Sequence, residues 1–265
     1  MLFRALSPCK PSSSLRAGAL IAALFAAVPL AAAANAAPER PAEVKHRYKA
    51  YVGGVLIGKA SLTTRFTAEG YSSEGKLETD GVAGWFVAAK AQASALGALD
   101  ASALEPERLD VTADSDGEAW RMSIAFSGGA PSEVSAEPPL RSRKWDIDPA
   151  SQTGALDPIS AIVRAMTGPM TSASAAAPCE RTLPVFDGRK RYDIVLEEQI
   201  DERVKDGVTI IECAARWTRV SGFKPKMMRK PDYPFTARFA IRDGLTVPVR
   251  IWGDTEFGGA VVVLR

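Results

Sequence analysis

Apolar and polar residues alternate along much of this chain, and turn-forming pairs interrupt the alternation at intervals. Residues 45–52 and 55–62 flank Gly53-Gly54, which predicts two strands joined by a tight hairpin. Residues 71–79 have the pattern of a third strand with one face in water. Residues 82–99 leave the choice open between a short helix and a strand. A chain with this pattern is constrained to build a sheet from neighbouring hairpins.

Turn-forming residues also separate strand patterns in the rest of the chain. Asp114-Ser115-Asp116-Gly117 is a strong turn signal between strand patterns at 108–113 and 118–126. Further strand patterns cover residues 181–186, 191–199, 208–219, 235–242, 246–252 and 261–264. Roughly ten strands without a repeat of fixed period favour an antiparallel sheet that is curved or partly closed.

One segment has helical spacing. Asp157 can cap a helix there, and Pro158 suits its first position. An apolar stripe follows at Ile159, Ile162, Val163 and Met166. We therefore predict a mainly β fold, a curved antiparallel sheet or half-open β-barrel with one or two short helices, in a single domain over residues 43–265. Residues 128–178 are expected to form a loop and helix excursion from that domain.

The first 36 residues have the pattern of a targeting segment rather than of a folded domain. Arg4, Lys10 and Arg16 give a positive start, an apolar run from 17 to 34 follows, and Ala34-Asn35-Ala36 has the form of a cleavage site. We expect a cleaved signal peptide over residues 1–36, an extended leader over 37–42 and a soluble mature protein outside the cytoplasm. A membrane-spanning helix is the alternative.

The composition excludes some classes of function but does not identify one. The chain has 265 residues, of which 46% are hydrophobic and 24% charged, as in ordinary globular proteins. Its net charge is +2, and cleavage after residue 36 would leave 30 basic against 31 acidic residues. A general nucleic-acid binder is therefore not expected. His46 is the single histidine, which leaves little room for histidine-based catalysis or a multi-histidine metal site.

The cysteines fit an oxidising compartment. Cys9 would leave with the signal peptide, so Cys179 and Cys213 remain as an even pair. We predict a structural disulfide between them. A catalytic or redox thiol is the alternative, but the chain has no Cys-x-x-Cys motif and no histidine near either cysteine.

Three segments are more specific than generic strands. They are residues 51–58 (YVGGVLIG), 157–160 (DPIS) and 179–193 (CERTLPVFDGRKRYD). Together they resemble a family of uncharacterised envelope proteins, the domain of unknown function 3108 (DUF3108). The resemblance implies a signal-bearing protein of the Gram-negative periplasm. It also implies an architecture similar to the Lol-type lipoprotein carriers, a half-open barrel with helices across its mouth and an apolar cavity, and it supplies no catalytic residue.

Motifs for catalysis or metal binding fail at specific positions. The acidic segment 110–118 does not match a calcium loop, because Thr112 and Ser123 stand where the first and last carboxylates are needed. Asp187 and Asp193 could perform acid–base chemistry if burial raised one pKa, although both also suit turn and strand positions. No Gly-x-Ser-x-Gly motif or Gly-rich phosphate loop occurs. We predict no catalytic residue, cofactor or metal site, and a carboxylate-based hydrolase is the least favoured function.

A basic stretch stands out among the later strand patterns. It consists of Arg216, Arg219, Lys224, Lys226, Arg229 and Lys230. Met227 and Met228 lie within it, and three prolines favour an extended loop. Such a loop can contact anionic headgroups of a membrane surface or a protein partner. A solvated loop without a partner is the alternative.

The favoured function is ligand binding rather than catalysis. We expect a non-enzymatic periplasmic protein that binds a hydrophobic or amphipathic molecule, such as an envelope lipid or lipoprotein, in the concave face of the sheet. The residues expected to approach the ligand are Trp85, Phe86, Ile159, Ile162, Met166, Met227 and Met228. The alternative is a structural or interaction protein with a filled core, which acts through the basic loop or an edge strand.

Overall fold

The computed structural model describes residues 41–80, 89–99, 103–168 and 178–265, which form a mainly β fold as predicted. The strands of the first half are β1 (Glu43–Val52), β2 (Val55–Phe66), β3 (Gly70–Thr79), β4 (Ala89–Leu99), β5 (Leu104–Ser115), β6 (Glu118–Ser127) and β7 (Ala130–Glu137). Those of the second half are β8 (Arg181–Phe186), β9 (Arg191–Lys205), β10 (Val208–Ser221), β11 (Tyr233–Arg242), β12 (Leu245–Thr255) and β13 (Gly258–Leu264). The helices are η2 (Pro149–Gln152), α1 (Pro158–Thr167) and α2 (Pro225–Met228).

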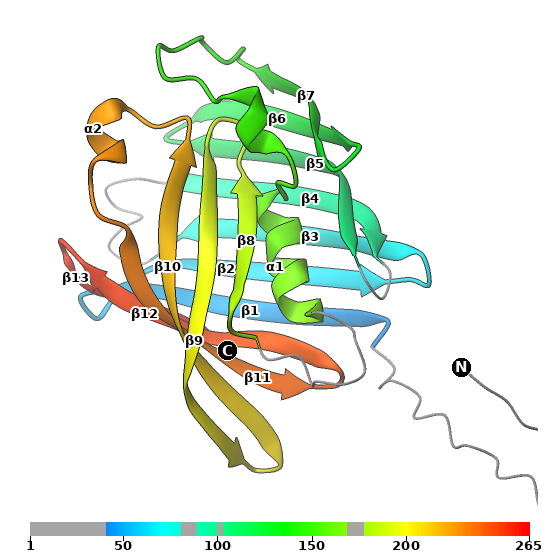
Figure 1. Cartoon of the computed structure of the whole chain (residues 1–265), viewed down its shortest axis with the longest axis vertical. Coiled ribbons are helices and arrows are strands. Elements are labelled where there is room, and N and C mark those ends of the chain that lie inside the picture. The colour runs from blue at the N-terminus through cyan, green and yellow to red at the C-terminus, as the bar shows by residue number, and fades with distance from the viewer. Residues whose placement is uncertain (1–40, 81–88, 100–102, 169–177) are drawn as a thin grey trace, which may run out of the picture. The chain divides into compact units, whose positions relative to one another are not determined.

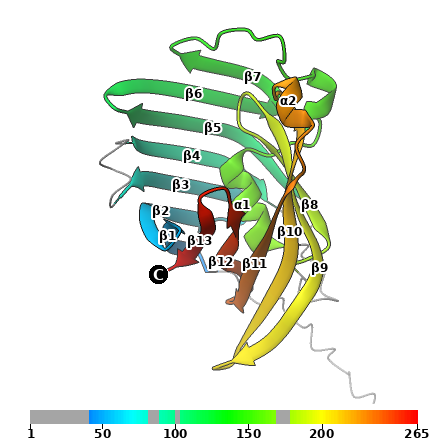
Figure 2. The same cartoon turned by 90° about the vertical axis from the view of Figure 1, so that its left-hand side faces the viewer.

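All thirteen strands belong to one antiparallel sheet in the order β7-β6-β5-β4-β3-β2-β1-β13-β12-β11-β10-β9-β8. Each half of the chain is a meander, and the two meanders meet where β1 pairs with β13. The sheet curves so that the two halves form facing walls with α1 between them (Figures 1 and 2). β7 and β8 do not pair with each other, so the barrel stays half open.

One strand was not predicted from the sequence, and one ambiguous segment is settled in part by the structure. β7 lies inside the expected excursion at 128–178, because it pairs with β6 along residues 130–137. This strand has an edge position with one neighbour, and its sequence APSEVSAE is too polar to show an apolar face. In the ambiguous segment 82–99, residues 89–99 form β4, whereas 82–88 lie outside the described residues. The expected signal peptide, 1–36, and leader residues 37–40 also lie outside them.

Helix α1 begins where the sequence predicts. One carboxylate oxygen of Asp157 accepts hydrogen bonds from the backbone N–H groups of Ile159 and Ser160, both at 2.9 Å. The other accepts the Ser160 hydroxyl, whose oxygen is also hydrogen-bonded to the Tyr71 hydroxyl of β3 at 2.5 Å. Asp157 and Ser160 are fully buried. This chain of polar contacts fixes the start of α1 on the inner face of the sheet.

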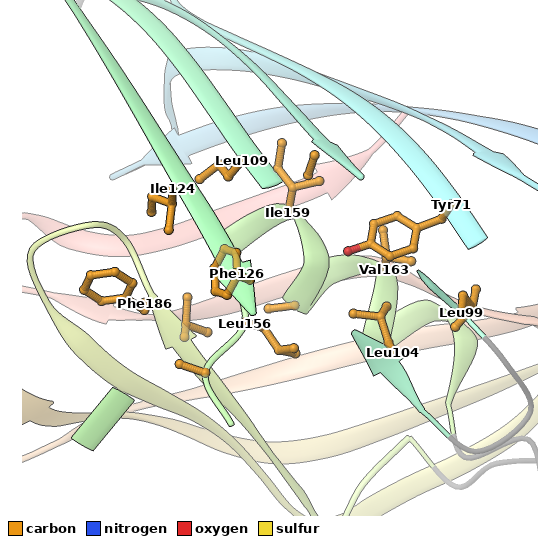
Figure 3. Close-up of a cluster of buried hydrophobic side chains, with 14 of the residues drawn as sticks. Tyr71, Leu99, Leu104, Leu109, Ile124, Phe126, Leu156, Ile159, Val163 and Phe186 are labelled. Carbon is orange, nitrogen blue, oxygen red and sulfur yellow. The ribbon is translucent and has the colours of Figure 1, made fainter. Parts of the chain in front are cut away.

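The main core lies between α1 and the inner face of the first meander. Leu109, Ile124 and Phe126 from β5 and β6 face Ile159 and Val163 of the helix (Figure 3). Val163 and Ile124 have no exposed surface. The apolar stripe of α1 therefore packs against the sheet as its helical spacing predicts.

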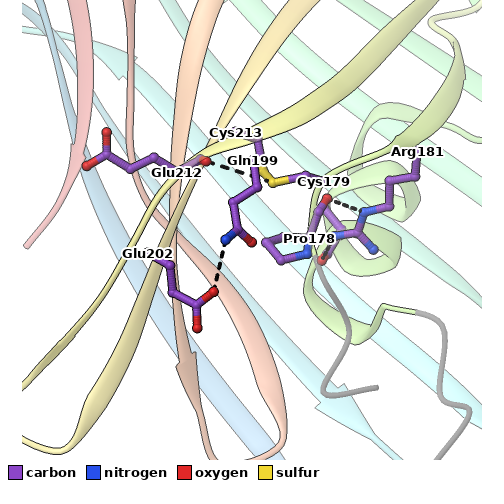
Figure 4. The surroundings of a disulfide bond; sticks show 8 residues. Pro178, Cys179, Arg181, Gln199, Glu202, Glu212 and Cys213 are labelled. Atoms are coloured by element: carbon purple, nitrogen blue, oxygen red, sulfur yellow. Dashed lines mark hydrogen bonds between the residues drawn. A yellow bond between two sulfur atoms is a disulfide. The ribbon is translucent and has the colours of Figure 1, made fainter. Parts of the chain in front are cut away.

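A second core cluster surrounds the disulfide that joins Cys179, just before β8, to Cys213 on β10. Their Cα atoms are 5.4 Å apart, and both side chains are buried beside Phe239 and Leu196. Arg181 lies close by and donates hydrogen bonds to the carbonyl oxygens of Pro178 and of a residue in the last turn of α1 (Figure 4). The predicted disulfide pairing is present, and it ties the segment after α1 to the second meander.

Candidate ligand-binding cavity

An apolar cavity of about 400 Å³ lies between α1 and the inner face of the sheet. Its helical wall is Ile159 and Ile162. The sheet contributes inward-facing residues from six strands, namely Tyr48, Ala60, Leu62, Gly75, Leu77, Ala91, Ala93, Pro248, Ile251 and Val262. A cavity of this size and lining is within the range of small-molecule sites, about 300–1,000 Å³.

The hollow results from small side chains opposite the helix. Ala60, Gly75, Ala91 and Ala93 come from three adjacent strands, β2, β3 and β4. Gly75 pairs directly with Ala93, whereas Leu77 stands between Ala60 and Ala91. A Cβ atom added at Gly75 would lie 3.3 Å from Cδ1 of Ile159, so the helix already approaches the floor as closely as a glycine permits. Larger residues in these positions would fill the space beneath α1.

Two inward-facing titratable side chains of β1 beside this cavity, Tyr48 and His46, are electrically neutral near pH 7. The Tyr48 hydroxyl is buried and has no hydrogen-bond partner among the described residues, and burial raises the pKa of Tyr48. Burial likewise lowers the pKa of His46, the neighbouring inward-facing residue on β1. Lys76 and Arg250 reach the lining from outward-facing positions of β3 and β12, beside the inward-facing Leu77 and Ile251. The inward-facing side chains are therefore uncharged, which favours an apolar occupant or the apolar part of an amphipathic one.

The cavity opens to water, because large apolar side chains of its lining are exposed. Leu77, Ile162 and Ile251 are on its border and are 57%, 39% and 37% exposed. A neighbouring hollow continues along the same face to Trp120 on β6, which is 40% exposed. Large apolar side chains in water at the mouth of an apolar cavity are typical of a binding groove.

The structure brings together part of the predicted ligand set. Ile159 and Ile162 line the cavity. Met166 is fully buried in the main core and is not one of the lining residues. Met227 and Met228 are on α2, which lies apart from α1 (Figures 1 and 2). Trp85 and Phe86, the remaining two, lie outside the described residues.

The predicted basic stretch forms no continuous loop. β10 extends through Arg216 and Arg219 to Ser221, and α2 then interrupts the expected extended segment. Arg216 pairs with Glu197 at 2.8 Å. Arg219 is 7% exposed and stacks on the rings of Trp217 and Tyr233, so it acts as a core residue.

The other four basic residues of the stretch remain at the surface. They are Lys224, Lys226, Arg229 and Lys230. Lys224 lies over the ring of Trp145, and Lys230 is 3.8 Å from Glu256.

The carboxylates that a hydrolase would need have local structural partners. Asp187 accepts hydrogen bonds from the backbone N–H groups of Arg189 and Lys190, as expected in a turn. Asp193 pairs with Arg191 at 2.5 Å. In the acidic turn, Asp114 accepts a hydrogen bond from the backbone of Gly117. Within the described residues, no group of three or more metal-ligating side chains comes together.

Sequence reasoning missed most of the cavity wall because it looked for large apolar residues. The clearest signal was β4, AKAQASALGAL, in which Ala89, Ala91, Ala93 and Ala95 alternate with larger or polar neighbours. A strand with an inner face of alanines fills little of the space beneath a helix. That pattern could have predicted a hollow at this place in the sheet.

Comparisons with known proteins identify the family. No curated protein matches the chain. A solved β-barrel-like protein of the domain of unknown function DUF1849 from Brucella abortus is similar, with 14% identity, coverage of 86% of this chain and 97% of that chain, and a TM-score of 0.49. No helix of the described residues has the length and apolarity needed to cross a membrane. The family described as "Protein of unknown function (DUF3108)" matches residues 47–265, so the chain belongs to the DUF3108 family.

Proposed function

We propose that this chain is a non-enzymatic protein of the periplasm that binds a hydrophobic or amphipathic envelope molecule in the concave face of its sheet. The observation that carries the proposal is the apolar cavity under α1, which opens to water past exposed apolar side chains. The signal-peptide pattern of residues 1–36 supports the location. A lipid or the lipid moiety of a lipoprotein has the chemistry that this site would accept.

The driving force would be removal of apolar surface from water. Each Å² of apolar surface buried contributes about 25 cal/mol, so an acyl chain that covers Leu77, Ile162 and Ile251 gains affinity along its whole length. The Tyr48 hydroxyl at the wall offers one uncharged polar group. The cavity would therefore select a ligand by the length and shape of its apolar part rather than by a charged headgroup.

An interaction protein that acts through the α2 segment is the second candidate. Met228 and Tyr233 are 43% and 44% exposed beside Lys224 and Arg229, which gives a basic surface with apolar tips. Methionine adapts to partners of varied shape. In this case Met228→Asp would abolish capture of a partner and leave any bound lipid unchanged.

The decisive experiment is native mass spectrometry of the mature protein purified gently from the periplasm. We expect an adduct of lipid mass that disappears on delipidation and returns on incubation with envelope lipids. Leu77→Asp should abolish the adduct, because it places a charge at the mouth of the cavity. Ile200→Asp is the matched control, since Ile200 on β9 is 52% exposed and does not line the cavity.

Two outcomes would contradict the proposal. A parent protein that shows no adduct even after incubation with envelope lipids would not be a lipid-binding protein. Equal retention of the adduct by both variants would place the lipid elsewhere on the surface. Both side chains are more than half exposed, so neither change should cost more than about 0.5 kcal/mol of folding stability.

A further inference from the structure

The outer face of the sheet carries a second hollow, on the opposite side of the same strands. It is a trough of about 360 Å³ that crosses β1 to β4 and reaches Arg265, the residue after β13. Its floor is the backbone of Tyr48, Ala60, Leu77 and Ala91, the row whose side chains line the inner cavity. Because side chains alternate along a strand, the flanking residues in each strand point outward and form the walls of this trough.

Those walls are strongly basic. The cationic side chains are those of Arg47, Lys49, Lys59, Lys76, Lys90 and Arg265, and the one acidic side chain in the lining is that of Glu78. Lys59 pairs with Asp80. Among the described residues, no carboxylate lies within ion-pair distance of the side chains of Arg47, Lys49, Lys76 or Lys90.

The sheet register also sets like charges opposite one another. Lys49 is the direct cross-strand partner of Lys59. On the other side of β1, the backbone of Arg265 pairs with that of Arg47. Directly opposed like charges destabilise a sheet. An anionic partner would remove that cost, so the arrangement is better suited to a bound polyanion than to water.

The extent of the trough favours an extended anionic surface. The four strands, together with Arg265 beside β1, span roughly 19 Å at the usual inter-strand spacing, which is more than a single phosphate covers. Four of the six cations are lysines, which act as point charges rather than as the planar fork that arginine offers to one anion. The basic face continues onto β12, where Arg250 lies over the ring of Trp252, a residue type enriched at membrane interfaces.

We propose that this convex trough docks the protein on the anionic headgroup surface of a phospholipid bilayer. The mature chain is close to neutral overall, so the attraction depends on the segregation of these cations on one face. Each lysine or arginine held near an anionic bilayer contributes to adsorption, and the contribution fades within a Debye length. The site is distinct from the surface residues Lys224 to Lys230 of the α2 segment.

The test is flotation of the mature protein with vesicles of phosphatidylglycerol and phosphatidylcholine in equal parts, against vesicles of phosphatidylcholine alone. The trough variant replaces Arg47, Lys49, Lys76 and Lys90 by Gln, which leaves the Lys59–Asp80 pair intact. The control variant replaces the four exposed cations of the α2 segment, Lys224, Lys226, Arg229 and Lys230, by Gln. Both variants lower the net charge equally, and all their substituted residues are on the surface or half-buried, so a thermal melt should show both folded.

We expect the parent to bind the anionic vesicles, to ignore the zwitterionic ones and to dissociate as salt is raised. The trough variant should lose affinity at least about tenfold, and the control variant less than about twofold. The proposal is overturned if the trough variant binds like the parent, if both variants lose equally, or if the parent binds both vesicles alike. Displacement by millimolar inorganic phosphate at constant ionic strength would instead indicate a soluble anion as the ligand. Uptake into the inner cavity cannot mimic the expected pattern, because both kinds of vesicle supply acyl chains.

Discussion

Enlarging two alanines of β4 separately should change stability in opposite directions. Ala91 and Ala95 lie on the same strand, face inward and are four positions apart. Ala91 lines the cavity and is half-buried, whereas Ala95 is 3% exposed inside the main core. A leucine side chain in place of Ala91 would extend into empty space beneath Ile162. A leucine side chain in place of Ala95 would have to displace packed neighbours.

The magnitudes follow from burial. Buried in full, the carbons that Ala91→Leu adds would contribute about 2 kcal/mol at roughly 0.8 kcal/mol per methylene, and we expect about 1 kcal/mol because the cavity is open at one end. Overpacking by Ala95→Leu should cost about 1–3 kcal/mol. For a domain of this size, each kcal/mol shifts Tm by about 2–4 °C. The strand-propensity change is the same at both positions and cancels in the comparison.

The assay is calorimetry of the delipidated mature protein, followed by native mass spectrometry with added lipid. Ala91→Leu should raise Tm and weaken the lipid adduct, and Ala95→Leu should lower Tm. The reasoning is refuted if both substitutions destabilise to the same degree, since the space beneath α1 would then be as fully packed as the core. A stabilised Ala91→Leu protein that still binds lipid at parental strength would place the ligand outside this cavity.

The remaining predictions concern the two ends of α1. Burial raises the pKa of the Asp157 carboxyl above its ordinary value of 3.8. The folded state therefore holds this proton more tightly than the unfolded state does. As a result, the free energy of unfolding should fall as the pH rises above about 4 and through the folded-state pKa. Asp157→Asn, which keeps the acceptor for the cap, should lack this slope in pH-dependent denaturation. Replacing Cys213 by Ser should lower the free energy of unfolding in urea by about 3–4 kcal/mol, given the sequence separation of 34 between Cys179 and Cys213. Burial, and then the charge of Arg164, lowers the pKa of Arg181 to about 10, so it stays protonated at pH 7. Arg181→Met should cost about 1–3 kcal/mol in the same assay, because it removes the donors to the carbonyl of Ala165 in the last turn of α1 and to that of Pro178.

The elements with strong local signals were predictable from the sequence. Alternation and turn pairs predicted the β1–β2 and β5–β6 hairpins, and Asp157-Pro158 predicted the start of α1. The Cys179–Cys213 pairing followed from counting cysteines. β7 was not predicted as a strand, because an edge strand needs no apolar face and its polar sequence resembles that of a loop.

The two hollows were harder to predict because neither is a local feature. The cavity depends on small residues of three strands that meet under one helix, and no single segment shows that meeting. Five of the six cations of the trough are ordinary outward-facing strand residues, and the sixth, Arg265, follows β13. By contrast, the basic run at 216–230 was conspicuous in the sequence. In the structure that run is divided between a buried Arg219, an ion-paired Arg216 and the surface of α2. Clustering in sequence is therefore a poor guide to charge on a sheet, whose neighbours are far apart along the chain.

The cavity and the trough both result from the pairing register of strands β1 to β4. Leu77 faces inward to the cavity, while Lys76 and Glu78 on either side of it face outward to the trough. Since side chains alternate with a period of two, a slip of one residue between β2 and β3 would turn the lysines into the cavity and the apolar row into water. The antiparallel pairing of β2 with β3 and of β3 with β4 holds this register, and α1 packs against the apolar face that the pairing creates. The features that would bind an apolar ligand inside and an anionic surface outside are thus specified by the same alternation that specifies the fold, and neither face can be moved along its strands without the other.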